Sequence, residues 1–178
     1  MMTLTVREMM ATEVDLIIDY FQNATPEYLE TLGVDPTRFP PTQVWRERLH
    51  REGKLPFDQR SVVAVIWLSH DRPVGFSTSD KIRYGEQANM HLHVTEPGRR
   101  HQGVGVECVR RTVDFYFEHL KLKRLFCEPY AFNVAPNRTL QKAGFKYLKT
   151  HMTVPSPINF RQAVTRWVME RQVRGSGE

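Results

Sequence analysis

Residues 100–105 read Arg-His-Gln-Gly-Val-Gly, an RxxGxG pattern that lies between a predicted strand, Met90 to Val94, and a strongly amphipathic stretch that predicts a helix. The first turn of a helix has backbone N–H groups without intrahelical partners, and the helix dipole adds about half a positive charge there. Gly103 and Gly105 let an anion approach the main chain without meeting a Cβ. The pattern therefore predicts a phosphate-binding turn, although a GxG before a helix is also the composition of a plain tight turn.

Two common phosphate-binding motifs are excluded by the residues that follow. A Walker-type loop would end in Gly-Lys-Ser/Thr, which is missing here. A dinucleotide-binding fingerprint would need a third glycine at position 108, which is Cys108 in this chain. The turn is therefore predicted to bind a phosphate of another kind.

Three further segments follow in order: a short apolar strand from Arg124 to Glu128, then Asn133, and then Asn-Arg-Thr-Leu-Gln-Lys-Ala-Gly-Phe at 137–145. The order and spacing of these segments, from Met90 to Phe145, resemble the GNAT superfamily of N-acetyltransferases. The resemblance implies an α/β (α+β) fold with a mixed, mostly antiparallel sheet of about six to seven strands and helices on both faces. We expect one acetyltransferase domain over residues 1–178, with a frayed tail at 174–178.

The resemblance also implies a co-substrate, acetyl-coenzyme A. In that family the main chain of the glycine turn binds the pyrophosphate, which here implies Arg100, His101, Gln102, Gly103, Val104 and Gly105. The preceding strand pairs with the pantetheine arm and the thioester carbonyl, which implies His93 and Val94. The asparagine that matches Asn133 commonly contacts the same arm.

Glu128 is the residue that the resemblance implies as the general base, because it stands five residues before Asn133, as in the ribosomal-protein alanine acetyltransferases of the family. An amine arrives mostly as ammonium and must lose a proton before it can attack a thioester. A main-chain N–H on the Val94 strand would stabilise the oxyanion that forms. No cysteine or serine lies in a nucleophile motif, so we expect direct attack. In the alternative interpretation Glu128 only ends a strand and pairs with Lys or Arg at the surface.

One departure from the family concerns the general acid. The usual tyrosine, seven residues after the asparagine, is replaced by Leu140. Tyr130 and the two histidines His91 and His93 are alternatives, none at the family's spacing. The histidines share one face of a strand, and we expect packing or hydrogen bonding from them first and proton transfer second. A zinc site would need further ligands at recognisable spacing, so no metal is expected.

Composition is that of an ordinary globular chain: 178 residues, 40% hydrophobic and 25% charged, with a net charge of +5. A basic surface suits an anionic partner, whether coenzyme A, an acidic protein or nucleic acid. Two cysteines without a CxxC pair predict buried thiols. The N-terminal residues do not resemble a signal peptide, and the longest apolar run, 62–68, is far short of the ~20 residues that span a bilayer. We therefore expect cytoplasmic residence and no membrane contact.

The remaining elements follow from periodicity and turn composition. A first strand is expected around Leu4 to Val6, then a helix capped by Thr12 and ending near Tyr20. The other expected strands are 61–68, 74–79, 88–94, 146–154 and 163–173, and the other expected helices are 27–32, 42–51 and 105–120. The last helix should bury Val106, Val109, Val113, Tyr116 or Phe117, and Leu120 against the sheet.

Three functions from different classes remain open. The favoured one is an N-acetyltransferase that moves an acetyl group from acetyl-coenzyme A to a primary amine. The second is a non-catalytic acyl-coenzyme A sensor on the same fold, and the third, a nucleic-acid-binding module, is weakest because aromatic and basic residues are not interleaved. Peptide amino termini, lysine side chains, aminoglycosides and polyamines are all compatible acceptors. Acceptor contacts are expected from 21–57 and from the last strands, and an edge strand would allow two copies to pair.

Overall fold

The structure, a computed structural model, describes residues 3–95 and 103–172. Its centre is a seven-stranded sheet in the order β1-β2-β3-β4-β5-β7-β6. The strands are β1 (Leu4–Glu8), β2 (Val63–Ser69), β3 (Arg72–Arg83), β4 (Gln87–Val94), β5 (Arg124–Cys127), β6 (Lys146–Thr153) and β7 (Gln162–Glu170). The α-helices are α1 (Asp15–Gln22), α2 (Pro26–Thr31), α3 (Thr42–Lys54), α4 (Val104–Leu120) and α5 (Val134–Ala143), and three short 3₁₀ turns lie at Ala11–Glu13, Pro36–Arg38 and Phe57–Gln59.

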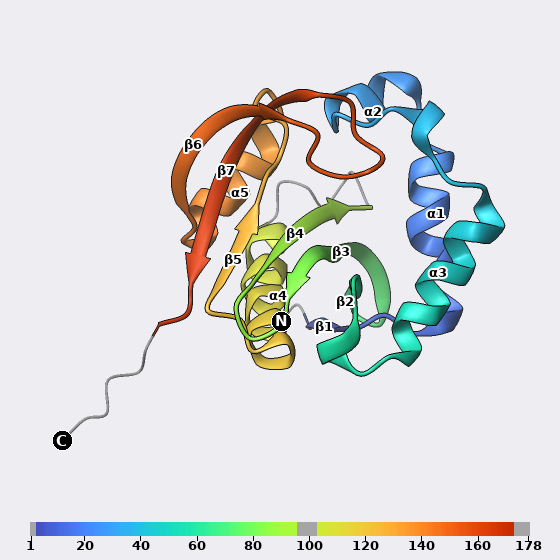
Figure 1. Cartoon of the computed structure of the whole chain (residues 1–178), viewed down its shortest axis with the longest axis horizontal. Helices are drawn as coiled ribbons and strands as arrows, with labels where there is room; N and C mark the ends of the chain where they lie inside the picture. The colour runs from blue at the N-terminus through green and yellow to red at the C-terminus, as the bar shows by residue number, and fades with distance from the viewer. Residues whose placement is uncertain (1–2, 96–102, 173–178) are drawn as a thin grey trace.

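Every neighbouring pair of strands is antiparallel except β4 and β5, which run parallel. These two strands pair only from Gln87–Arg124 to Met90–Cys127, whereas β4 continues to Val94 along β3. Figure 1 shows their tips pointing apart. The sheet is therefore open between the last four residues of β4 and the end of β5.

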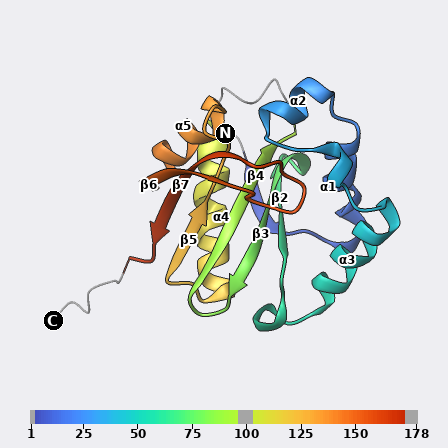
Figure 2. The same ribbon diagram turned by 45° about the horizontal axis from the view of Figure 1, so that its top comes forward.

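Helices cover both faces of the sheet, as Figures 1 and 2 show: α1, α2 and α3 lie on one side, and α4 and α5 on the other. Each side has its own apolar core. One contains the buried face of α4 together with Trp67, Met90 and Leu140, and the other contains α1 residues with Ile66 and Phe76. The predicted fold class and the three adjacent antiparallel strands β2, β3 and β4 are confirmed.

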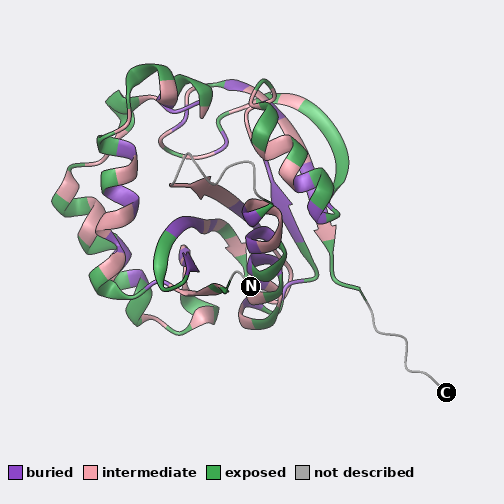
Figure 3. Ribbon diagram, turned by 180° about the vertical axis from the view of Figure 1, so that it is seen from behind, coloured by how far each residue is buried: buried purple, intermediate pink, exposed green. Residues whose placement is uncertain are grey.

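The buried stripe of α4 differs in detail from the predicted one. Val109, Val113 and Leu120 are buried as expected, and Tyr116 rather than Phe117 is the aromatic residue with no exposed surface. Val106 is only half-buried, and its expected place is taken by Cys108 and Thr112. The stripe is thus wider than predicted, on the side of Cys108 and Thr112, and Figure 3 shows buried residues along α4.

One predicted helix start was wrong. Thr12 does not cap a helix but lies inside the turn Ala11–Glu13, where the Met10 N–H donates to Glu13 Oε2 at 2.8 Å, and α1 begins at Asp15. Helix α5 begins at Val134 and has Pro136 in its first turn, where a missing N–H costs no intrahelical bond.

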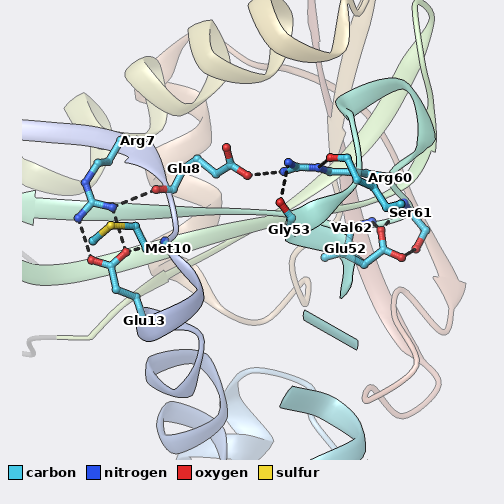
Figure 4. A network of polar contacts seen from close by, with 10 residues as sticks. Arg7, Glu8, Met10, Glu13, Glu52, Gly53, Arg60, Ser61 and Val62 are labelled. Carbon is cyan, nitrogen blue, oxygen red and sulfur yellow. Dashed lines mark hydrogen bonds and ion pairs between the residues drawn. The ribbon is translucent and has the colours of Figure 1, made fainter. Parts of the chain in front are cut away.

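A polar network fastens α3 to the sheet (Figure 4). Glu52, which is 8% exposed, accepts hydrogen bonds from the Ser61 N–H (2.7 Å), the Ser61 hydroxyl (2.8 Å) and the Val62 N–H (3.1 Å). Burial alone would raise the pKa of Glu52, but these bonds outweigh it and lower the pKa below 4.5. Arg60 pairs with Glu8 of β1 and donates to the Leu55 carbonyl at 2.7 Å.

Candidate active site

Gly103 is the N-cap of α4 and has φ +73°, in the left-handed region that glycine adopts without strain. Among the described residues no side chain caps this helix end, and the first-turn N–H groups of a helix have no acceptor within the helix itself. Glu107, the one acidic residue in that turn, is paired with Arg111 at 2.8 Å. The end of α4 therefore keeps the electrostatic character that suits an anion.

Gly105 plays a different part from Gly103. Its φ is not positive, and a Cβ there would lie 3.8 Å from Thr139 Cγ2 of α5 and 4.0 Å from Val94 Cγ2 of β4, which are ordinary contacts. The fold alone does not require a glycine at 105. The missing Cβ leaves room beside the tip of β4 and the start of α4.

The other residues of the RxxGxG turn, Arg100, His101 and Gln102, lie outside the described residues. Two arginines of α4 that could have faced a phosphate are engaged in the fold. Arg110 donates to the Lys142 carbonyl at the end of α5 (3.0 Å), and Arg111 bonds Glu107 and the Leu4 carbonyl.

The open edge of β4 presents main-chain groups to the gap beside β5. The Thr95 N–H donates to the Val74 carbonyl of the β3 side at 2.9 Å, and successive residues of a strand direct their main-chain groups to opposite sides. His93 thus bonds towards β3, whereas Leu92 and Val94 direct their N–H and C=O groups into the gap. Of the two residues predicted to contact the pantetheine arm, Val94 therefore offers its main chain and His93 its side chain.

Asn89, His91 and His93 form a polar row on the face of β4 that packs towards α1–α3, and each meets a polar group of another element. Asn89 Nδ2 lies 3.5 Å from Glu128 Oε2, and His93 Nδ1 lies 3.3 Å from the Tyr20 hydroxyl, which is itself 2.7 Å from the Tyr28 hydroxyl. His91 Nε2 is 3.1 Å from Asp80 Oδ1, outside hydrogen-bond geometry. The two histidines therefore have different partners although they share a face.

The side chains of this row differ in their electrostatic surroundings. Burial, with a smaller contribution from His91, lowers the pKa of His93 from 6.5 to about 3, so this imidazole is neutral at neutral pH. Burial is the largest single influence on Asp80 and would raise its pKa, but the combined attraction of His91, Lys81 and Arg48 exceeds it, and the pKa of Asp80 is lowered. His91 and Asp80 thus form an imidazole–carboxylate pair at the edge of the site, and His93 forms a neutral aromatic patch with Tyr20, Phe21 and Phe76.

Glu128 follows the last residue of β5 and is 7% exposed. Its Oε1 accepts from Arg166 Nη1 of β7 at 2.9 Å and lies 3.7 Å from His151 Nε2 of β6. The Arg166 guanidinium lies 4.1 Å above the Phe126 ring, which fixes its position. Glu128 therefore does pair with an arginine, but in a buried site and not at the surface as in the alternative interpretation.

A pocket opens where β4 and β5 part, and its lining comes from segments far apart in the sequence. β4 contributes His91, Leu92 and His93, and the end of β5 contributes Cys127, Glu128, Pro129 and Tyr130. The remaining lining residues come from α1 and α2, from the start of α5 and from the β6–β7 loop: Phe21, Leu32, Val34, Asn133, Pro136, Pro155, Ser156, Ile158, Asn159 and Gln162. Residues of 21–57 and of the last strands thus line the pocket, the regions from which acceptor contacts were expected.

The carbonyl of Gly33 joins two walls of this pocket. It accepts from Gln162 Nε2 (2.7 Å), Asn159 Nδ2 (2.9 Å) and the Phe160 N–H (3.2 Å). Gly33 has φ +70°, and a Cβ there would lie 2.2 Å from Gln162 Oε1. Figures 1 and 2 show the resulting contact, in which the β6–β7 loop reaches across to α2. Position 33 therefore requires glycine for both its backbone and its neighbours.

Asn133 and Leu140 stand at the positions where the family usually has an asparagine and, seven residues later, a tyrosine. Asn133 is the N-cap of α5 without a side-chain capping bond, and it lines the pocket. Leu140 has no exposed surface and packs in the core, so no side chain at 140 reaches the pocket. Among the predicted alternatives for a general acid, Tyr130 is the phenol that lines the pocket beside Glu128.

Metal ligands and reactive thiols do not gather at this site. Within residues 3–95 and 103–172 no three His, Cys, Asp or Glu side chains are grouped to hold a metal ion. Cys127 lines the pocket, but burial raises the pKa of its thiol, as it raises that of Cys108 to about 12. Neither thiol is activated as a nucleophile.

Sequence reasoning did not identify several residues of the site: Tyr20, Gly33, Asp80, Gln162 and Arg166. Each lies on an element with ordinary composition, and none stands at a fixed spacing from the glycine turn. The one usable signal was Gly33 directly after a predicted helix, the common position of a left-handed helix end.

The family model described as the acetyltransferase (GNAT) domain matches residues 3–146. The chain belongs to the GNAT acetyltransferases. No curated protein matches it. The implied fold and resemblance are therefore confirmed, and this GNAT protein is an acyl-coenzyme A-dependent N-acetyltransferase with acetyl-coenzyme A as co-substrate.

Solved structures of low sequence identity share the fold of this GNAT protein. An aminoglycoside acetyltransferase, AAC(6')-Ib, in complex with coenzyme A and kanamycin has 17% identity and a TM-score of 0.70, with 95% of each chain covered. The spermidine N-acetyltransferase of Vibrio cholerae, with coenzyme A and spermine, has 16% identity and a TM-score of 0.72, over 94% of this chain and 95% of that chain. The ribosomal-protein-S5-alanine acetyltransferase of Vibrio fischeri has 14% identity and a TM-score of 0.71, over 94% and 92%.

Proposed function

We propose that this GNAT protein acetylates a primary amine held in the pocket between β4 and β5, with Glu128 as the general base. The observation that supports the proposal is the buried Glu128 carboxylate at the point where the two strands part. Family membership favours an enzyme over the non-catalytic sensor.

Coenzyme binding is assigned to the opposite end of the same gap. The first-turn N–H groups of α4 at Gly103, Val104 and Gly105 bind the pyrophosphate, as do Arg100, His101 and Gln102 in the loop before them. The pantetheine arm then lies along the open edge of β4, where Val94 offers main-chain groups, His93 its side chain and Asn133 an amide from α5. This path points the thioester towards Glu128.

The reaction is proposed as direct attack. The Glu128 carboxylate takes a proton from the ammonium, directly or through one water, and the neutral nitrogen attacks the thioester carbon. The oxyanion receives a hydrogen bond from a main-chain N–H of Leu92 or Val94, and such a donor is worth roughly 3 kcal/mol in barrier height. The C–S bond then breaks, the nitrogen gives its second proton to solvent to leave the neutral amide, and coenzyme A leaves as a thiolate.

Tyr130 is proposed as the proton source for that thiolate, since Leu140 is buried in the core. The phenol lines the pocket beside Glu128. His93 is a poorer acid–base group because burial keeps its pKa near 3. Arg166 positions Glu128 and leaves Oε2 facing Asn89 at the long distance of 3.5 Å.

The remaining features of the chain are assigned on indirect grounds. One seven-stranded sheet supports a single domain, and buried, unpaired Cys108 and Cys127 support residence in the reducing cytoplasm. No helix in the described part of the chain is long and apolar enough to cross a bilayer. Pairing of two copies through the exposed edge strand β6 stays a prediction.

The test is Glu128→Gln, with Glu118→Gln on the exposed face of α4 as the matched control. Thiol release from acetyl-coenzyme A is measured against a panel of primary amines. We expect kcat to fall about 10²–10⁴-fold in Glu128→Gln, with coenzyme affinity kept, and to stay unchanged in the control. Full turnover in Glu128→Gln would remove Glu128 from the role.

A further inference from the structure

The walls of the pocket are apolar or uncharged almost throughout. Within the described part of the chain, Glu128 is the one acidic side chain that lines it. The wall facing β4 is built from aliphatic and aromatic groups, with amides and one hydroxyl from the β6–β7 loop: Phe21, Leu32, Val34, Pro155, Ser156, Ile158, Asn159 and Gln162.

The single carboxylate does not give the pocket a free negative charge. Arg166 donates to Glu128 Oε1 at 2.9 Å, and His151 lies 3.7 Å from the same oxygen. Asp80, a half-buried carboxylate on the neighbouring strand β3, is paired with His91. A ligand that brought several ammonium groups into this pocket would find no carboxylate for the second one, and an unpaired buried charge is strongly unfavourable.

One wall residue has an unused hydrogen-bond acceptor. Gln162 is 3% exposed, and its Nε2 is occupied by the carbonyls of Gly33 and Phe160 (2.7 and 3.0 Å). Its Oε1 has no hydrogen-bond partner among the described residues. This oxygen has almost no accessible surface and lies against Gly33, so it is not open to a ligand in the pocket.

We propose that the acceptor is a monoamine: one primary amine on a compact apolar body, and not a polycation. The inference rests on the proposed function, because it assigns the acceptor to the same pocket. It separates this chain from the polyamine and aminoglycoside enzymes that share its fold. The proposed substrate class thus follows from the residues that line the pocket and not from the fold.

The experiment compares 2-phenylethylamine and alaninamide with spermidine and kanamycin, first by kcat/KM with acetyl-coenzyme A. The expected result is a preference of at least tenfold for the two monoamines. Equal or better turnover of spermidine or kanamycin would overturn the proposal.

Leu32→Glu provides a charge test, and Leu32→Gln is its matched control. Leu32 is half-buried, follows α2 and lines the pocket, so the substitution adds a carboxylate to the wall. We expect Leu32→Glu to shift the ratio of spermidine to 2-phenylethylamine by about tenfold towards spermidine, and Leu32→Gln to leave the ratio near that of the wild type. The same ratio in both variants would contradict the inference. Ile158→Glu repeats the test from the β6–β7 loop if Leu32→Glu does not fold.

A binding arm distinguishes failure of this inference from failure of the proposed function. The four amines are titrated by calorimetry into protein saturated with coenzyme A, which cannot react. Tighter binding of the monoamines supports the proposal even if no amine is acetylated, a result that would overturn only the catalytic role. Tighter binding of spermidine or kanamycin, or no binding of any of the four, overturns the proposal itself.

Discussion

The two ends of the gap between β4 and β5 are both organised around glycine, but the glycines act differently. Gly103 and Gly105 lie at the start of α4, where one supplies a left-handed turn and the other leaves space for a ligand. Gly33, on the pocket side, has its carbonyl bonded by three donors of a loop more than 120 residues away along the chain. The end proposed to bind the coenzyme is thus a local structure, and the end proposed to bind the acceptor is formed where distant segments meet.

The difference teaches that the two halves of such a site are under different constraints. A turn and a helix end are set by neighbouring residues, so they can keep one ligand across many acceptors. A joint between loops depends on long-range packing, so its shape and charge can change without disturbing the helix end. Substitutions on the two sides should therefore affect different steps.

Gly33→Ala should have the largest effect. Alanine would be strained at φ +70° by about 1–2 kcal/mol, and its Cβ would displace the buried Gln162 amide, which costs about 1–3 kcal/mol more. We expect a loss of about 3 kcal/mol in the free energy of unfolding, measured in urea, and a raised KM for the amine. An unchanged amine KM in folded protein would show that the joint does not shape the pocket.

Glu52→Gln tests how much the hydrogen bonds between α3 and the segment before β2 stabilise the fold, since Glu52 accepts all three of them. The pKa of Glu52 is lowered in the folded protein, so its carboxylate stabilises the fold above about pH 4.5, and this contribution is lost as the pH falls through the lower, folded pKa. We expect Glu52→Gln to reduce stability by about 2 kcal/mol at neutral pH. The difference in the free energy of unfolding between wild type and Glu52→Gln should become smaller on acidification to about pH 3. A difference that stays constant with pH would contradict this role of the Glu52 carboxylate.

Tyr130→Phe tests the proposed proton donor, which lies between the coenzyme end and the acceptor end of the site. If the phenol protonates the leaving thiolate, kcat should fall about tenfold, less than for a typical general acid because a thiol near pKa 8.5 leaves readily. Coenzyme and amine affinities should persist. An equal fall in kcat for Tyr147→Phe, an exposed tyrosine on β6, would point to a general effect and not to proton transfer.

Gly103→Ala and Gly105→Ala should give the smallest stability changes, of opposite sign. Gly103→Ala forces alanine to φ +73° and should cost about 1 kcal/mol. Gly105→Ala should be neutral or stabilise the helix by about 0.5 kcal/mol, because its Cβ has only ordinary contacts. Thermal unfolding of both variants measures the contrast, and a destabilised Gly105→Ala would mean that the fold itself needs that glycine.

The sequence predicted most of the local structure and little of the contact between Gly33 and the β6–β7 loop. The glycine turn, the β4 strand and the α4 helix could be located because turn chemistry and apolar periodicity are written in neighbouring residues. The pairing of Glu128 with Arg166, and of Gly33 with Gln162, could not, because it depends on which loops meet after folding. The start of α1 was misplaced for a local reason, because the Met10 N–H bonds Glu13 and a separate turn forms before Asp15.

Calorimetric titration of acetyl-coenzyme A into wild-type, Gly105→Ala and Gly33→Ala protein tests the division of the site most directly. The account predicts that Gly105→Ala weakens coenzyme binding at least tenfold while its stability is kept, and that Gly33→Ala binds the coenzyme like wild type. Wild-type affinity in Gly105→Ala, or no binding of acetyl-coenzyme A to the wild type, would contradict it.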